Sequence, residues 1–185
     1  MHLEDSGKAS IRVQVVTNLS PEGTPAFLLG YEGGSVQFAG SERFQNGKIS
    51  FLIDTSKLAA GITTFTVFDG QYNPVCERLF FKRPSANLDI KLGGTAIEYG
   101  TRQKIDLDIS AYTAAAPAMN GNFSVSVALN DSLEDNMTGE DISSYLWLGS
   151  ELKGNIENPG YYFYGKSNDV IEATNNLLMT HGCGN

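Results

Sequence analysis

The chain has 185 residues, of which 41% are hydrophobic and 18% are charged, and its formal net charge is −8. This length allows one large domain or two small ones, and the negative charge disfavours binding to nucleic-acid phosphates or anionic lipid head groups. No apolar run reaches the roughly 20 residues that a membrane-spanning helix needs. The first residues also lack the pattern of a signal peptide. We therefore expect no nucleic-acid partner and no membrane contact by this chain, which we interpret as a piece of a longer protein.

The first part of the chain predicts a small β-sandwich. Residues 8–16 alternate between apolar and polar side chains, which is typical of a half-buried strand. Asn46-Gly47 is a strong hairpin signal, because both residues tolerate a positive φ. About seven strands are expected here, which suits a sandwich of this size. They fall at residues 8–16, 26–31, 35–39, 41–45, 48–53, 62–68 and 74–82.

A linker is predicted at Arg83-Pro84-Ser85-Ala86-Asn87, because proline cannot donate a hydrogen bond to a strand ladder. It separates two predicted domains, 8–84 and 85–185. The second domain begins with the strand-like segments 88–92, 104–111 and 122–129. The predicted fold is mainly β, with two immunoglobulin-like β-sandwich domains, the second of which carries C-terminal helices.

Two helices are predicted in the last third of the chain. The first covers residues 141–152, where the apolar positions follow a period of 3.6 residues; these positions are Ile142, Tyr145, Leu146 and Gly149. The second follows the capping residues 167–169, and its apolar stripe consists of Val170, Ile171, Thr174, Leu177 and Leu178. Both helices are expected to pack on the second sandwich.

The residues that carry catalysis or bind metals are sparse. The chain has two histidines and two cysteines, and none of them has the spacing of a zinc site. The acidic residues of segment 131–141 do not match a calcium loop. We therefore predict no enzyme activity, no cofactor and no metal. Cys76 is interpreted as a half-buried apolar residue and Cys183 as a free thiol, although a bridge between them stays open.

Four consecutive aromatic residues, Tyr161-Tyr162-Phe163-Tyr164, form the most unusual local feature of the sequence. They predict one of two structures. Tyr161, Tyr162 and Tyr164 are the candidate contact residues if the run is a platform for a glycan or a protein partner. Alternatively, the run is a strand that places Tyr161 and Phe163 on one face and covers the helices.

The segment Leu148–Phe163, together with Leu177–Gly182, resembles a family of large bacterial cell-envelope proteins. These proteins carry macroglobulin-like β-sandwich domains and often lead into a TonB-dependent receptor plug and barrel. The run Gly47–Asp69 and the residues Glu77-Arg78-Leu79 look like the preceding macroglobulin-like domain of that family. Cys183-Gly184-Asn185 departs from the family pattern, which continues with Trp-Arg-Arg.

This resemblance implies a non-catalytic structural or protein-interaction module of an outer-membrane or envelope protein, linked to TonB-dependent nutrient uptake. The implied partners are other domains of the parent protein or other envelope proteins. A glycan-binding module that uses residues 161–164 is the alternative function. A protease-inhibitor-like macroglobulin module is a weaker one, because the Cys-Gly-Glu-Gln motif of thioester macroglobulins is missing.

Overall fold

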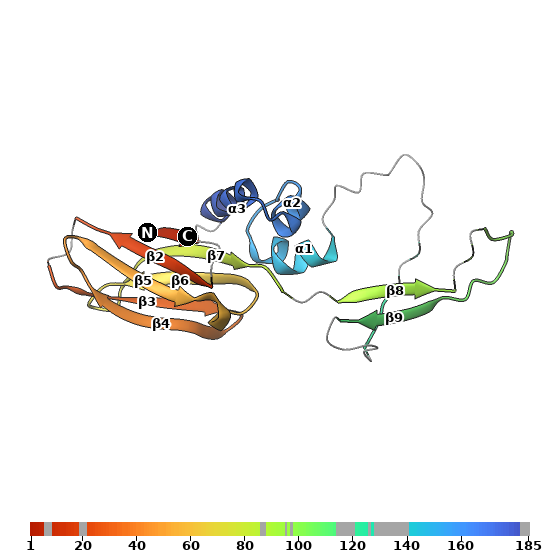
Figure 1. Cartoon of the computed structure of the whole chain (residues 1–185), viewed down its shortest axis with the longest axis horizontal. Helices are drawn as coiled ribbons and strands as arrows, with labels where there is room; N and C mark the ends of the chain where they lie inside the picture. The colour runs from red at the N-terminus through yellow and green to blue at the C-terminus, as the bar shows by residue number, and fades with distance from the viewer. Residues whose placement is uncertain are drawn as a thin grey trace. The chain divides into compact units, whose positions relative to one another are not determined.

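The computed structural model describes residues 1–5, 9–18, 22–85, 88–94, 96, 98–113, 121–125, 127 and 141–181. The chain is mainly β, and it forms several antiparallel sheets and a few C-terminal helices (Figure 1). Its residues group into two compact units. The first contains Met1–Arg83 and Asn136–Asn185, and the second contains Pro84–Asp135.

Two antiparallel sheets build the first unit. One has the strand order β1-β2-β5 and the other the order β4-β3-β6-β7. Their strands are β1 (His2–Asp5), β2 (Ser10–Val16), β3 (Pro25–Glu32), β4 (Ser35–Arg43), β5 (Lys48–Asp54), β6 (Gly61–Phe68) and β7 (Pro74–Lys82). Segments 35–39 and 41–45, predicted as two strands, form the single strand β4 up to Arg43. Strand β1 was not predicted.

The core of the first unit lies between these two sheets. Alternation of apolar residues buries Ile11 and Val13 of β2 completely, and they share one apolar cluster with Leu28 and Phe65 of the opposite sheet. The predicted turn at Asn46-Gly47 is confirmed, with φ angles of 50° and 70°. It does not close a hairpin within one sheet, however, because β4 and β5 belong to different sheets. The turn instead carries the chain from one layer to the other.

A layer of short helices covers part of the outer face of the four-stranded sheet. This helical layer consists of α1 (Ile142–Trp147), the 3₁₀ turn Gly149–Glu151, α2 (Pro159–Tyr164) and α3 (Asn168–His181). Figure 1 shows it beside β7. Its side chains share an apolar cluster with two strand residues, Ile62 of β6 and Phe81 of β7. The residues that the helical layer contributes to this cluster are Leu148, Leu152, Ile156, Phe163, Leu177 and Leu178.

The prediction that the helices pack on the second sandwich is therefore wrong. The reason lies in β7, where Leu79 and Phe81 point to one face of the sheet while Phe80 points to the other. A strand that is apolar on both faces needs cover on both. The core between the sheets buries Phe80, and the helical layer buries Phe81.

The prediction for the first helix is also wrong in its length and in its buried face. Helix α1 stops at Trp147, because Leu148 leaves helical geometry with a φ of −132°. The predicted core residue Ile142 is 75% exposed, and Leu146 is 57% exposed. Leu148, just beyond the break, is fully buried instead. For α3 most of the predicted stripe is confirmed, since Val170, Thr174, Leu177 and Leu178 are buried, whereas Ile171 is half-buried.

Arg83 ties the helical layer to the end of β7. Its guanidinium donates to the carbonyl oxygens of Tyr162 at 2.7 Å and Phe163 at 3.2 Å. The same group lies 5.6 Å from the ring centroid of Phe81. Because these carbonyls end the short helix α2 and have no helical partner of their own, a cation is well suited to them.

In the described part of the second unit, regular structure is limited to a two-stranded antiparallel sheet. It consists of β8 (Asp89–Gly93) and β9 (Asp108–Tyr112). Residues 122–125 and 127, which belong to the predicted strand 122–129, are not in a strand here. The remainder of that segment and the acidic residues 131–140 lie outside the described residues. A second sandwich is thus not confirmed.

Candidate binding surface

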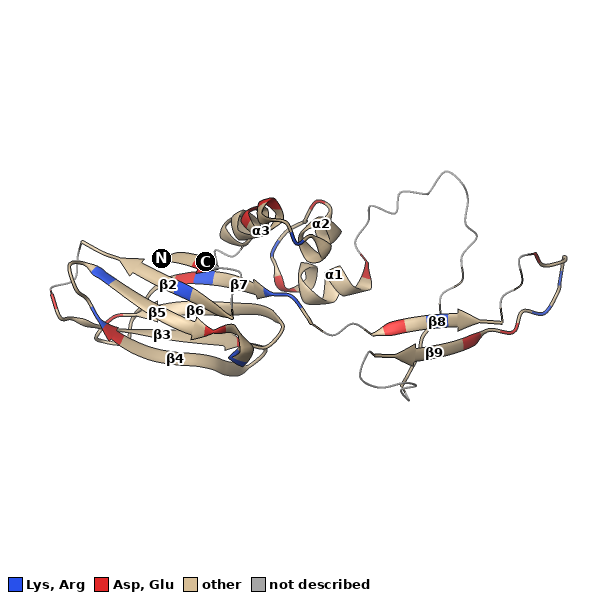
Figure 2. Cartoon of the chain, viewed as in Figure 1, with Lys and Arg blue, Asp and Glu red and all other residues tan. Residues whose placement is uncertain are grey.

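The helical layer leaves part of the four-stranded sheet uncovered, and a groove lies there. The residues that line it come from β3, β4 and the end of β6, with Tyr72 from the β6–β7 turn. The groove has a volume of about 460 Å³ and is lined by Phe27, Leu28, Leu29, Ala39, Gly40, Ser41, Phe68 and Tyr72. None of these side chains is charged. Figure 2 shows the charged residues of β3 and β4 only at the ends of these strands.

A pair of stacked aromatic rings forms one side of the groove. The rings of Phe27 and Tyr72 have centroids 4.8 Å apart and planes inclined by 21°. Tyr72 is 70% exposed, so one ring face lies on Phe27 while much of the side chain faces solvent. Stacked pairs of this kind contribute about 0.5–1.5 kcal/mol beyond the area that they bury.

The backbone holds Tyr72 in an uncommon conformation. Its φ is 65°, a region that non-glycine residues rarely adopt. The neighbouring Asp69 fixes the turn, because its carboxylate accepts hydrogen bonds from the backbone N–H groups of Gln71 and Asn73. The Asn73 bonds, followed by the Gln71 bond, lower the pKa of Asp69. Strain of this kind persists where the surroundings fix it, and it is frequent at ligand-binding positions.

The predicted contact residues Tyr161, Tyr162 and Tyr164 lie on α2 and not on a strand. Pro159 at the first helical position favours the helix, and helical geometry then separates the side chains. Tyr161 and Tyr164 are 44% and 55% exposed, whereas Tyr162 packs against the apolar cluster under the helical layer. The rings of Tyr161 and Tyr162 are inclined by 84°, so the three tyrosines do not form one flat platform.

One of these tyrosines has a structural contact. The Tyr164 hydroxyl donates to the Asp141 carboxylate, which also accepts a 2.7 Å hydrogen bond from the backbone N–H of Ser144 and so caps α1. The Ser144 bond, followed by the Tyr164 bond, lowers the pKa of Asp141. The same contact raises the pKa of Tyr164.

We predict that acid loosens the contact between α1 and α2. Because the pKa of Asp141 is lowered in the folded chain, the carboxylate stabilises the fold above its unfolded pKa of about 3.9. This stabilisation is lost as the pH falls from about 4 through the lower folded value. Thermal unfolding between pH 7 and pH 2.5 should show a smaller acid loss for Asp141→Asn than for the natural chain. Equal acid losses would contradict the prediction.

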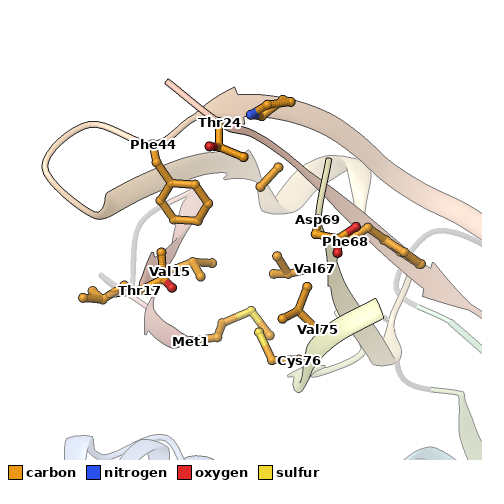
Figure 3. A pocket seen from close by; sticks show the side chains of 13 residues that line it. Met1, Val15, Thr17, Thr24, Phe44, Val67, Phe68, Asp69, Val75 and Cys76 are labelled. Atoms are coloured by element: carbon orange, nitrogen blue, oxygen red, sulfur yellow. The ribbon is translucent and has the colours of Figure 1, made fainter. Parts of the chain in front are cut away.

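A second hollow, the end pocket, opens at one end of the two-sheet core. It has a volume of about 400 Å³, and its lining includes Val15, Phe44, Val67 and Cys76. Figure 3 shows these side chains around a common space. Cys76 is half-buried, as predicted from its strand context, and its thiol is free. Burial raises the pKa of this thiol. Cys183 lies outside the described residues.

Groups for metal chemistry are not seen among the described residues. No cluster of three or more His, Cys, Asp or Glu side chains is found in the ranges that the structure describes. The helices in those ranges are too short or too polar to cross a bilayer.

Asp54 resembles Asp69, because its hydrogen bonds to Ser56 within a turn lower its pKa.

Comparisons of the chain with protein-family models, with curated proteins and with solved structures found no match. The macroglobulin-like resemblance therefore stays a prediction. Sequence reasoning did not find the groove, since it depends on residues from three strands. The signal that was available is the alternation of Phe27, Leu29 and Tyr31, which places large apolar side chains on the face of β3 opposite to Ala26 and Leu28.

Proposed function

We propose that this chain is a non-catalytic interaction module of a larger bacterial envelope protein, and that the groove is its contact surface for another polypeptide. The observation that carries the proposal is the uncharged groove on a sheet face whose other part is covered by the chain's own helices. An apolar patch that stays exposed to solvent, beside a part of the same sheet that helices cover, is typical of an interaction site. The placement in the envelope, with its link to TonB-dependent uptake, rests on the family resemblance.

The fold supports such a role, because the groove lies on a rigid base. Leu28 beneath it is 1% exposed. The backbone of Phe27 and Leu29 pairs with strand β4 on one side and with strand β6 on the other. A contact surface on central strands needs little ordering when a partner binds, and this reduces the entropic cost of association. The proposed partner is an apolar segment of a neighbouring domain or of another envelope protein.

We also propose that the second unit belongs to a second β-sandwich. Ile90, Leu92, Ile109 and Ala111 share one face of the β8–β9 sheet, and Ile90 and Leu92 are 58% and 60% exposed. A sheet of two strands is marginal in water without a further layer. An apolar face of this kind therefore supports the expectation of a second layer.

A peptide array that tiles the parent protein and its encoded neighbours tests the proposed function. We expect Leu29→Lys to abolish binding of apolar peptides, because the charge enters the groove. Leu52→Lys is the matched control, since Leu52 is 66% exposed on the outer side of β5 in the other sheet. Equal peptide binding by the two variants would overturn the proposal, as would the absence of peptide binding by the natural chain.

Glycan binding is the second candidate, and Tyr72 is the observation that favours it. A pyranose ring stacks on a flat aromatic face, and the Tyr72 ring is held in place by Phe27 and by the Asp69 turn. A glycan array with the natural chain and Tyr72→Ala tests this candidate. Tyr161→Ala is the control that separates the groove from the aromatic run on α2. Glycan binding that depends on Tyr161 and not on Tyr72 would move the site to α2.

A further inference from the structure

Arg78 of β7 carries a cation into the interior side of an edge strand. It pairs with Phe65 in the sheet register, and Phe65 is fully buried between the two sheets. Arg78 therefore lies on the same side of the sheet as Phe65, where its side chain is half-buried at the sheet edge. β7 is the last strand of its sheet, so this cation lies along the open edge of the core.

Within the residues that the structure describes, no carboxylate forms an ion pair with the Arg78 guanidinium. Its Nε atom is buried and has no hydrogen-bond partner. Burial lowers the pKa of Arg78, and no carboxylate offsets the effect. A guanidinium stays charged in proteins, and a buried donor without a partner costs free energy. A half-buried cation whose Nε atom lacks a partner is a candidate position for an external anion.

The end pocket reaches Cys76 on β7, two residues before Arg78, which is not itself a lining residue. Cys76, which lines the pocket, is two residues from Arg78 on the same face of β7, since it pairs with the buried Val67. Residues i and i+2 of a strand are about 7 Å apart. Met1, Val67 and Cys76 line the pocket, and Figure 3 shows them around the space. Asp69 lines the pocket as well, but its carboxylate accepts hydrogen bonds from Gln71 and Asn73.

We propose that the end pocket and Arg78 together form a binding site for an amphipathic monocarboxylate such as a medium-chain fatty acid. The alkyl chain occupies the pocket, whose volume of about 400 Å³ falls in the range of small-molecule sites. The carboxylate accepts hydrogen bonds from the Arg78 guanidinium. This pairing removes the cost of the unpartnered donor, and charge-assisted bonds of this kind are among the strongest in proteins.

Decanoate and decanol are the probes that test the site, because they differ in the group that Arg78 would bind. We expect decanoate to bind saturably with one site per chain in calorimetry. Arg78→Met keeps an unbranched apolar stem and should weaken decanoate binding by about tenfold or more. The same variant should leave decanol binding unchanged. Arg12→Met is the matched control, because Arg12 is exposed on the outer side of β2, and it should bind decanoate as the natural chain does.

A second measurement locates the alkyl chain. In a Cys183→Ser background, decanoate should slow the reaction of Cys76 with a thiol reagent, because both occupy the same pocket. This slowing should disappear in Arg78→Met at the same decanoate concentration. Circular dichroism checks that each variant is folded. Three outcomes would overturn the proposal: decanoate does not bind, decanoate binds Arg78→Met as tightly as the natural chain, or Cys76 reacts at the same rate with and without decanoate. Preference for an apolar peptide carboxyl terminus over decanoate would also overturn it.

Discussion

Replacing Leu148 by alanine is expected to lower the free energy of unfolding by about 2–5 kcal/mol, the range for a buried leucine that leaves a cavity. Leu148 is fully buried, and it joins the helical layer to Ile62 and Phe81 of the sheet. Its loss therefore weakens the contact between two layers as well as the packing of one side chain.

The chain contains its own reporter for this experiment. Trp147 is its single tryptophan, and its ring lies beside Gly61 at the start of β6. Tryptophan emission during urea unfolding thus follows the docking of the helical layer on the sheet. Leu146→Ala is the control, since Leu146 is 57% exposed on the same helix and should change stability by less than about 0.5 kcal/mol. Equal midpoints for the two variants would show that the layer is not docked.

Replacing Gly30 by valine is expected to destabilise the two-sheet core by at least about 1–3 kcal/mol, the usual cost of overpacking. A Cβ atom on Gly30 would lie 2.6 Å from the ring of Phe65 and 3.2 Å from Cβ of Phe38. Phe65 is fully buried, so its ring can move only if its neighbours in the core move as well. Gly30 is therefore a packing requirement of the core.

Ala39→Val is the matched control for Gly30→Val. Ala39 lies on β4, the strand beside Gly30, but it is exposed on the outer face. Valine suits an exposed strand position, so this variant should unfold at a denaturant concentration close to that of the natural chain. A small effect of Gly30→Val in the same denaturation series would mean that the Phe65 ring rearranges.

The strands of the first unit could be predicted because alternation is a local signal. Ile11, Val13 and Val15 reveal both the strand and its buried face without reference to other residues. The helical layer was harder to predict, because its burial depends on where α1 ends. The apolar period included Ile142 and Leu146, yet the break at Leu148 turns the following segment onto the sheet. Periodicity cannot predict a break that tertiary packing selects.

The candidate sites follow the same division between local and long-range information. The aromatic run on α2 was conspicuous in the sequence, but its helical geometry separates the side chains. The groove depends on the register between β3, β4 and β6, and on a strained turn at Tyr72. In the sequence, Arg78 occupies one of the polar positions of an alternating strand. Its place on the inner side of the sheet became apparent only from its pairing with Phe65.

The division of the first unit into two chain segments has a consequence for synthesis on the ribosome. The apolar side chains of Ile62 and Phe81 are made long before Leu148 and α3, which cover them. At ~5–20 residues per second, the nascent chain exposes this surface for a time on the order of seconds. During that interval the second unit, Pro84–Asp135, is the part being translated. The first unit is therefore incomplete until the second has left the ribosome, so the nascent chain passes through a stage in which a holdase chaperone has a surface to bind.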